Sequence, residues 1–347
     1  MRNSRKSRIV VLMGGKSPEH EVSVISGSEI VKNLNPKRYS VLPVVISKTG
    51  EKWTLTDRKS LVGLRDTLSL RGTGKEITLD RTRSLKGVEN ISSDGVDTVF
   101  IAMHGPFGED GTVQGVLELA GLKYTGSGVL ASALGMDKIM FRKVMIASGI
   151  PIPKYVVVKH GENFKHVHKT LKHPPYFVKP FNQGSSVGAS IVRKEKDLGK
   201  ALKLAHKYSE LALVDEYLKG KELTCAVIGN EKPITLPVIE IKPLKGEFFD
   251  YESKYTESGA EEMVPAKISK RVAKKVQDTA SAVYKAIGAR GFARVDFILK
   301  DKEKPIVLEI NTIPGLTPMS LLPKAAKAAG ISYSKLIDKI INYAQQK

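Results

Sequence analysis

Two strand-like runs near the end of the chain place acidic, basic and amide side chains where together they could hold a divalent cation. The segment FARVDFILKDKEKPIVLEIN, residues 292–311, predicts a hairpin that turns at KDKEK. In this hairpin Asp296 faces Glu309, and Arg294 faces Asn311. Because side chains alternate along a strand, all four lie on one face. Two opposed carboxylates repel each other, and a divalent cation removes that repulsion.

The donor atoms of this hairpin favour Mg²⁺ or Mn²⁺ over zinc, because carboxylates and an amide offer only hard oxygen ligands. The pairing requires a turn centred between Lys302 and Glu303, and a slip of one residue would separate the four side chains. The alternative is a solvent-facing edge hairpin in which Arg294 simply neutralises its acidic neighbour. The flanking apolar residues Val307 and Leu308 argue against full exposure.

Two glycine-rich loops are candidates for phosphate binding or catalysis. Lys179 ends the run YFVK and precedes PFNQGSSVGAS, which offers flexible backbone amides beside one point charge. The pattern differs from GxxxxGK[ST], because the lysine precedes the loop. The loop MHGPFGEDGTVQG, residues 103–115, follows a strand and opens a helix at Thr112. His104 in this loop is either a catalytic group or a hydrogen-bonded structural residue.

Two further segments could hold the charged ends of a small molecule. GGKSPEHEVS, residues 14–23, follows the first strand, and the carboxyl end of a parallel strand is where α/β sheets bind ligands. Glu19 or Glu21 there could contact a ligand, or could favour the next helix through its dipole. In TIPGLTPMS, the turn at Pro314-Gly315 brings Ser320 and backbone amides near a strand end, where they could hold a carboxylate.

The elements around these residues predict an α/β domain followed by an α+β portion. The first ~130 residues alternate short apolar strands (RIVVLM, YSVLPVVIS, DTVFIAM) with helical runs at 23–34 and 112–121, a βαβ order typical of a parallel sheet. Residues 55–95 have little pattern and predict loops or a peripheral hairpin. Beyond them the sequence predicts antiparallel strands from Ala212 to Pro243. Helices are expected at 131–149, around 162–172, and at 196–209, 269–288 and 332–346.

Composition bounds the class of protein. The 347 residues carry 56 Lys and Arg against 36 Asp and Glu, a formal charge of +20 that would attract polyanions. The basic residues are scattered and aromatic residues are only 6%, so no nucleic-acid-binding platform is expected. The single Cys225 excludes an internal disulfide framework and a four-cysteine zinc site. No apolar run is long enough for a membrane span, and we expect a cytoplasmic protein.

Taken together, the motifs resemble those of the D-alanine–D-alanine ligases of the ATP-grasp superfamily. The resemblance runs in the family's order along nearly the whole chain and is weakest at residues 55–95. It rests on GGKSPEHEVS, HGPFGEDGTVQG, YTGSGVLASALGMDK, FVKPFNQGSSVG, VDEYLKGKELT, FFDYESKY, ARVDF and EINTIPGLTPMS. It implies an α/β fold, with an N-terminal Rossmann-like parallel-sheet domain (1–130) followed by an ATP-grasp α+β domain of two subdomains (131–213 and 214–347).

The resemblance also implies cofactors and the residues that bind them. ATP would be a substrate, with two lysines on its phosphates, the GSSVG loop closing over them, and two glutamates at adenine and ribose. These nucleotide-binding residues would be Lys138, Lys179, Ser186, Glu216, Glu222 and Lys254. Two Mg²⁺ or Mn²⁺ ions would be held by Asp296, Glu309 and Asn311, in agreement with the hairpin pattern.

Catalytic roles follow from the same resemblance. Glu19 would receive the amino group of a first D-alanine, and Ser185 and Tyr255 would complete a hydrogen-bond network with it. The oxyanion of the tetrahedral intermediate would be stabilised at Arg294 and Gly315. The carboxylate of the second substrate would bind at Ser320 and Leu321.

The implied reaction joins two D-alanines for peptidoglycan precursors through an acyl phosphate made from ATP. No protein nucleophile is needed, so Cys225 is interpreted as a core residue. Tyr255 in the sequence KY favours an amine over a hydroxy acid as second substrate. The alternatives are an ATP-grasp ligase that uses D-lactate or D-serine, and a nucleotide-binding regulatory module without activity. The expected partners are D-alanine, ATP and a second copy of the chain, with no nucleic acid and no membrane.

Overall fold

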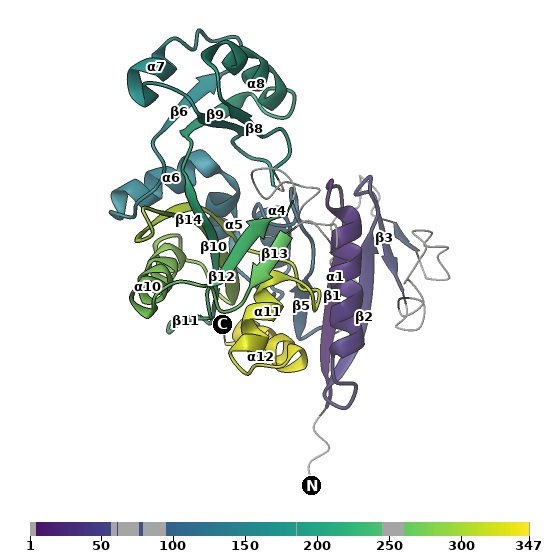
Figure 1. The fold of residues 1–347 in the computed structure, drawn as a ribbon. Helices are drawn as coiled ribbons and strands as arrows, with labels where there is room; N and C mark the ends of the chain where they lie inside the picture. Colours follow the sequence, from purple (N-terminus) through teal and green to yellow (C-terminus); the bar gives the residue numbers. More distant parts are fainter. Residues whose placement is uncertain are drawn as a thin grey trace.

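Apolar β-branched runs near the start of the chain form a mainly parallel sheet, which we call the N-terminal sheet (Figure 1). The computed structural model describes residues 5–56, 61, 76–78, 95–184, 186–244 and 260–346. The strand order is β4-β3-β2-β1-β5, with β1, β2 and β5 parallel and β3 and β4 added antiparallel at one edge. Its strands are β1 (Ser7–Gly14), β2 (Tyr39–Ile46), β3 (Lys52–Leu55), β4 (Glu76–Thr78) and β5 (Thr98–Ile101).

A pair of glycines turns the chain from β1 into the first helix. Gly14 and Gly15 have φ of +82° and +102°, a region that other residues rarely adopt. A Cβ on Gly14 would also lie 2.3 Å from the carbonyl oxygen of Ile46. Helix α1 (His20–Asn33) then crosses to β2, as the βαβ pattern predicts, and its first turn stands at the carboxyl end of β1.

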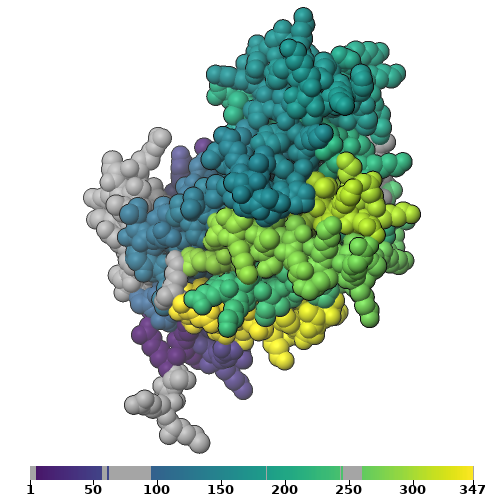
Figure 2. Space-filling model, turned by 90° about the vertical axis from the view of Figure 1, so that its left-hand side faces the viewer, coloured from purple at the N-terminus to yellow at the C-terminus, as the bar shows by residue number. Residues whose placement is uncertain are grey.

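A second sheet, the central sheet, forms the lobe at the top of Figure 1, and Figure 2 shows this lobe rising above the rest of the molecule. Its order is β6-β9-β7-β8, and every pairing is antiparallel. Tyr176 and Val178 pack with helices α7 and α8 in one core, so the alternate residue Lys179 lies on the opposite face. The elements are β6 (Tyr155–Lys159), α7 (His166–Leu171), β7 (Tyr176–Pro180), β8 (Ser190–Val192), α8 (Leu198–Ala205) and β9 (Leu211–Glu216).

The third sheet, the C-terminal sheet, is antiparallel with the order β13-β12-β10-β14-β15, and β11 pairs with β10. Apolar side chains of α10 (Lys270–Ala286) pack against β10, β14 and β15. Cys225 is buried on β10 in this core, as interpreted from the sequence. The strands are β10 (Gly220–Ile228), β11 (Ile234–Thr235), β12 (Ile239–Pro243), β13 (Ala260–Met263), β14 (Phe292–Lys300) and β15 (Lys304–Asn311).

The helix expected at 131–149 is two helices, and the prediction of one continuous helix is wrong. Between α5 (Val129–Met136) and α6 (Lys138–Ala147), Asp137 is extended, with φ −80° and ψ 96°. Its carboxylate accepts the backbone N–H groups of Ile139 and Met140, both at 2.9 Å, and so caps α6. The break makes Lys138 the first residue of a new helix.

The last helices of the chain pack on the first sheet. Helix α4 (Thr112–Leu119) and helices α11 (Leu321–Ala328) and α12 (Tyr333–Gln345) share one hydrophobic core with β1, β2 and β5. Figure 1 shows the yellow helices beside the purple and blue strands. The domain boundaries at 130 and 213 stay predictions. Strand β9 runs across residue 213 within the central sheet. Within the described ranges, no helix is long and apolar enough to cross a membrane.

Two glycine-to-alanine substitutions should have opposite effects on stability. A Cβ on Gly220 would lie 2.3 Å from the carbonyl oxygen of Leu299, so Gly220→Ala should destabilise the fold by about 1–3 kcal/mol. Gly115 lies inside α4, where the nearest atom to an added Cβ is Val129 Cγ2 at 3.9 Å. Gly115→Ala should therefore stabilise by about 0.5–1 kcal/mol. Denaturant unfolding measures the free energy of unfolding of both variants. If both substitutions raised it, or both lowered it, the packing around these two glycines would be contradicted.

Candidate active site

The hairpin β14–β15 has the predicted register at the four polar residues. Arg294 pairs with Asn311, and Asp296 pairs with Glu309. All four are partly buried, while the alternate residue Val295 is buried on the other face of the sheet. The pairing that brings two carboxylates opposite each other is therefore confirmed, and β14 is an inner strand between β10 and β15 rather than an edge.

Nearer the turn the predicted register is wrong by one residue. A β-bulge after Asp296 shifts the pairing, so that Phe297 faces Val307 and Lys300 faces Lys304. Phe297 and Val307 are both fully buried, and the bulge brings them into one core while the acidic residues keep their own face. A centre between residues 302 and 303 would have placed Leu308 opposite Phe297 instead.

Arg294 binds Asp296 through two nitrogens of its guanidinium. Its Nε and an Nη each donate to the carboxylate of Asp296 at 2.8 Å, and Thr224 Oγ1 donates to the same carboxylate at 2.6 Å. The two side chains are only 13% and 14% exposed. Burial disfavours the charged guanidinium, but the carboxylates of Asp296, Glu309 and Glu109 outweigh it and raise the pKa of Arg294. The neutralisation foreseen in the edge-hairpin alternative is thus present, but inside the molecule.

Lys138 joins the hairpin to the glycine-rich loop after β7. Its Nζ lies 3.3 Å from Glu309 Oε2 and donates to the carbonyl oxygen of Gln183 at 2.7 Å. The side chain is 8% exposed. One ammonium therefore contacts both the acidic strand and the residue that precedes Gly184.

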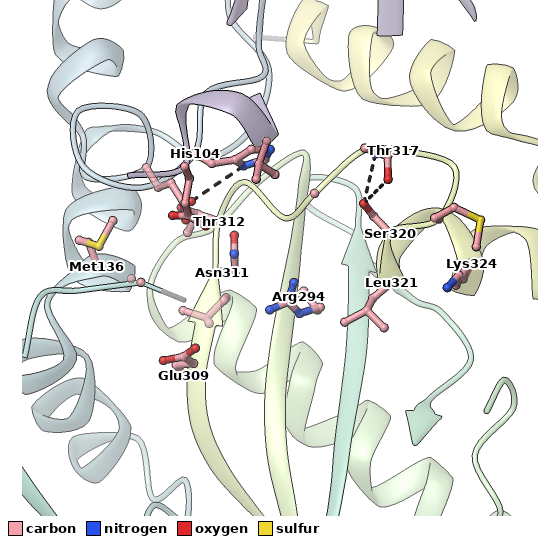
Figure 3. A pocket seen from close by; sticks show the side chains of 18 of the residues that line it. His104, Met136, Arg294, Glu309, Asn311, Thr312, Thr317, Ser320, Leu321 and Lys324 are labelled. Carbon is pink, nitrogen blue, oxygen red and sulfur yellow. Dashed lines mark hydrogen bonds and ion pairs between the residues drawn. The ribbon is translucent and has the colours of Figure 1, made fainter. Parts of the chain in front are cut away.

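A cavity of about 760 Å³ opens between the N-terminal sheet, the C-terminal sheet and this loop. Figure 3 shows Glu309 and Asn311 beside Arg294, with Ser320 and Thr317 from the following loop nearby. The cavity brings together many of the predicted site residues. Those that line it are Glu19, Lys138, Arg294, Glu309, Asn311, Gly315, Ser320 and Leu321.

Other predicted residues lie elsewhere. Asp296, Lys179, Ser186, Glu216 and Glu222 are described, but they are not among the residues that line this cavity. The remaining predictions, Ser185, Lys254 and Tyr255, lie outside the described residues.

Glu19 stands directly before α1, yet its side chain makes no capping hydrogen bond to that helix. Its Oε2 lies close to two glycines of separate loops. A Cβ on Gly105 would be 2.8 Å from this oxygen, and one on Gly184 would be 3.3 Å from it. The two glycines leave room for the carboxylate at the cavity wall. By contrast, Glu21 forms an ion pair with Lys48, which lowers the pKa of Glu21.

The loop after β15 places a hydroxyl group at the opposite side. Ser320 Oγ accepts the backbone N–H of Thr317 at 3.2 Å and lies 2.8 Å from Thr317 Oγ1. A Cβ on Gly315 would lie 2.8 Å from Ser320 Oγ, so this approach needs a glycine. Ser320 directly precedes α11, where backbone N–H groups are available to an anion. Ser320 lines the same cavity as Asn311, the last residue of β15.

Sequence reasoning considered His104 but missed its neighbour Glu109. His104 Nδ1 donates to the carbonyl oxygen of Ile313 at 3.0 Å, and Nε2 lies 3.1 Å from Ser26 Oγ. It is thus a hydrogen-bonded residue that also lines the cavity, and burial lowers its pKa. Glu109 accepts the N–H of Gly105 at 2.7 Å. Burial, together with the charge of Glu19, raises the pKa of Glu109 to about 8. The adjacent acidic residues Glu109 and Asp110 at the end of HGPFGED were the sequence signal that could have identified Glu109.

Lys179 lies on the face of the central sheet away from α7 and α8, buried beside an aspartate. Its Nζ is 3.5 Å from Asp215 Oδ2, and Arg142 makes two hydrogen bonds to the same carboxylate. Burial lowers the pKa of Lys179 to about 8, although Asp215 opposes this shift. No local sequence pattern points to Arg142 and Asp215, because 73 residues separate them.

The two glutamates expected at adenine and ribose lie near the junction of the central and C-terminal sheets. Glu216 ends β9, where its carboxylate accepts the N–H of Lys154 at 2.9 Å and lies 3.9 Å from Lys300 Nζ. Glu222 is partly buried on β10, opposite Ile298 of β14. Ser186 has φ of +59° in the loop between β7 and β8, immediately beyond the cavity residue Gly184.

The donor chemistry of the hairpin fits a magnesium ion. Within the part of the chain that is described, no three residues of the types His, Cys, Asp and Glu gather as a metal site. Here the third donor is instead the amide of Asn311, whose Oδ1 accepts the N–H of Ile313 at 2.9 Å. The carboxylate of Asp296 accepts three hydrogen bonds and has about four acceptor positions, so one is left. Glu309 is 29% exposed toward the cavity.

Comparison with known proteins identifies the family. Residues 8–127 match the family model described as D-ala D-ala ligase N-terminus, and residues 144–342 match D-ala D-ala ligase C-terminus. A D-alanine–D-alanine ligase of Pelotomaculum thermopropionicum is 37% identical over 346 residues, which cover 98% of this chain and 97% of that protein. The chain belongs to the D-alanine–D-alanine ligase family. Its members are ATP-dependent, ADP-forming ligases.

Solved structures of this ligase fold cover nearly the whole chain. The D-alanine–D-alanine ligase of Coxiella burnetii matches with a TM-score of 0.84 and 30% identity, over 99% of this chain and 95% of that one. The VanG D-Ala:D-Ser ligase of Enterococcus faecalis matches with a TM-score of 0.80 and 33% identity, over 98% and 100%. The ligase of Bacillus anthracis complexed with ATP has a TM-score of 0.76 and 32% identity, over 98% of each chain.

The buried Glu109 should make the stability of this ligase depend on pH. The pKa of Glu109 is about 8 in the fold against 4.5 for an ordinary glutamate, so between these pH values the folded chain holds a proton that the unfolded chain has lost. The contribution of Glu109 to stability therefore falls as pH rises from 4.5 to 8. Glu109→Gln removes this contribution, and its melting temperature relative to wild type should rise over that interval. Glu51→Gln, at an exposed position, is the control. If the melting temperatures of Glu109→Gln and wild type changed in parallel with pH, the raised pKa of Glu109 would be contradicted.

Proposed function

We propose that this ligase joins two D-alanines into D-alanyl-D-alanine for peptidoglycan precursors, with ATP converting the first carboxylate into an acyl phosphate. The observation that carries the proposal is the charge pattern of the cavity. Glu19 presents a carboxylate, Lys138 and Arg294 present positive charges, and Ser320 presents a hydroxyl beside a helix start. A substrate with an ammonium and a carboxylate, next to a transferred phosphoryl group, is complementary to that pattern.

The first D-alanine would bind with its ammonium at Glu19, where two glycines make room for the carboxylate. Ser185 and Tyr255 are proposed to complete the hydrogen bonds around it. As the second amine attacks the acyl phosphate, negative charge develops on the former carbonyl oxygen. The guanidinium of Arg294 and the backbone N–H of Gly315 would stabilise that charge, and both residues line the cavity.

The second D-alanine would place its carboxylate at Ser320 and Leu321, at the start of α11. The serine hydroxyl and the N–H groups of the first helical turn are suited to an anion. The amine of this substrate would then point back toward Arg294. This arrangement uses binding energy to align the amine with the acyl carbon, so no covalent bond to the protein is required.

The nucleotide would lie between the central and C-terminal sheets. Lys138 and Lys179 would bind its phosphates, with Ser186 in the loop over them. Glu216 is proposed at the adenine and Glu222 at the ribose, and Lys254 is a further proposed contact. The support is positional, since Lys138 begins α6 and contacts the carbonyl oxygen of Gln183, while Lys179 lies near the end of β7, just before the same loop.

We propose that Asp296, Glu309 and Asn311 hold two Mg²⁺ or Mn²⁺ ions. All three offer oxygen donors on one face of the hairpin, which is the donor set these cations prefer. When bound, the ions would neutralise charge on the phosphates during phosphoryl transfer. In the chain itself, Arg294 and Lys138 supply positive charge to the same two carboxylates.

The second substrate and the assembly are the finer parts of the proposal. D-Serine is the main alternative as amine, since a D-Ala:D-Ser ligase is among the similar structures. D-Lactate is the alternative hydroxy acid. D-Alanine is favoured because relatives that share nearly the full length are named D-alanine–D-alanine ligases. We further propose a cytoplasmic homodimer.

The decisive experiment measures phosphate release from ATP and Mg²⁺ with D-alanine, L-alanine, D-serine or D-lactate added. D-Alanine alone should support release, and D-alanyl-D-alanine should appear in equal amount. Mixed assays of D-alanine with D-serine or D-lactate identify the preferred second substrate from the product. Folded protein that releases no phosphate with D-alanine would exclude the proposed function.

The proposed metal ligands make a separate prediction. Asp296→Asn and Glu309→Gln should each lower turnover by about a hundredfold or more, because each removes a charged ligand from the phosphoryl-transfer site. The matched controls are Asp301→Asn and Glu303→Gln in the exposed turn of the same hairpin. Rates measured across a magnesium titration are the test. Near-normal activity of either ligand variant at limiting Mg²⁺ would show that the metal site is elsewhere.

A further inference from the structure

A fully buried arginine on α6 has no role in the site described so far. Arg142 is 0% exposed and lies one helical turn after Lys138. Its two terminal nitrogens donate to the two carboxylate oxygens of Asp215 on β9, at 2.5 and 2.7 Å. Its guanidinium also stacks over the ring of Tyr155 on β6, 4.7 Å from the ring centre. Its Nε finds no acceptor in the part of the chain that the structure describes. The two parallel hydrogen bonds to Asp215, which we call the fork, therefore hold the guanidinium in position.

The aspartate that receives this fork also holds the buried lysine of β7. Asp215 Oδ2 lies 3.5 Å from Lys179 Nζ, and the two side chains are 4% and 12% exposed. One carboxylate thus serves two cations, and the buried trio keeps one positive charge in excess. Taking such charges out of water is unfavourable unless each is paired. The excess charge is suited to an anion, and Lys179 is the member of the trio that lies closest in sequence to the glycine-rich loop.

The trio adds a side-chain link between α6 and the central sheet, beside the hydrogen bond from the N–H of Lys138 to the carbonyl oxygen of Phe181 at 3.1 Å. Lys138 begins α6, and Arg142 sits on that same helix, so both move as one rigid body. Lys179 belongs to the central sheet, and among the described residues its ammonium contacts Asp215 and the ring of Phe177, the latter at 5.7 Å. The position of one lysine relative to the other therefore depends on the Arg142–Asp215 pair.

We propose that Arg142 and Asp215 are positioning residues for nucleotide binding. Arg142 clamps Asp215, and Asp215 in turn keeps the Lys179 ammonium charged and aimed at the phosphates, at a fixed distance from Lys138. This inference rests on the proposed role of Lys179 at ATP phosphates. An arginine is required because its planar fork holds both carboxylate oxygens, whereas a lysine offers a single point charge.

The first test replaces the fork without removing the charge. Arg142→Lys should raise the KM for ATP and the dissociation constant of a non-hydrolysable ATP analogue by about tenfold, while the KM for D-alanine changes less than about twofold. Arg290→Lys is the matched control, because Arg290 also stacks on a tyrosine ring, 5.0 Å from the centre of Tyr124, but lies in the loop between α10 and β14 rather than on α6. A lowered melting temperature with unchanged ATP affinity would overturn the proposal, since it would show a purely structural role.

The second test asks whether the effect passes through Lys179. In a Lys179→Met background, Arg142→Lys should weaken binding of the analogue by less than about twofold, because the positioned group is already gone. An undiminished tenfold loss in that background would overturn the proposal. A length exchange tests whether the fork is required. Arg142→Lys with Asp215→Glu restores the reach across the pair but not the two parallel hydrogen bonds, so ATP affinity should stay as weak as in Arg142→Lys. Recovery of ATP affinity in the double variant would contradict the need for an arginine.

Analogue binding, measured by calorimetry, separates this inference from the proposed function. Wild-type protein that binds the analogue but makes no D-alanyl-D-alanine would refute the reaction and leave the positioning role standing. Active wild-type protein with unaltered analogue binding in Arg142→Lys would refute the positioning role alone.

Discussion

The constraint on which the rest of the site depends is the opposition of two carboxylates within a partly buried face. Asp296 and Glu309 face each other on adjacent strands, where like charges repel strongly because little water screens them. Each is stabilised by a cation from the chain, Arg294 for one and Lys138 for the other. Lys138 can reach Glu309 only because α6 begins where it does. The positions of α6 and of the β14–β15 hairpin together therefore determine whether both carboxylates are paired with a cation.

Sequence patterns predicted the parts of this arrangement that depend on local periodicity. The alternation of side chains gave the face shared by Arg294 and Asp296, and the apolar runs gave the βαβ order of the first sheet. The bulge beside Phe297 escaped prediction because it depends on the burial of Val307 against α10, which is distant in sequence. The break at Asp137 is local, but its capping hydrogen bonds compete with a helical pattern that continues on both sides.

The buried charges show a different limit of sequence reasoning. Glu216 stays a prediction for the adenine, while the carboxylate beside Lys179 belongs to the preceding residue, Asp215. Successive residues of a strand point to opposite faces, so a difference of one position decides which side chain enters a site. Arg142 carries no local signal at all, because its partner is 73 residues away. Such pairs can be found only when the sheet order and the helix position are both known.

The packing of α11 and α12 on the N-terminal sheet has a consequence for biosynthesis. Leu336, Ile337, Ile340 and Ile341 complete a core that begins with Ile9 and Val11, so the first strands are covered by residues near the end of the chain. A ribosome that adds 5–20 residues per second needs roughly ten seconds or more to reach the last helix after the first sheet has emerged. During that interval an apolar face of the nascent sheet stays open. Final closure of the N-terminal part therefore waits for the synthesis of α11 and α12.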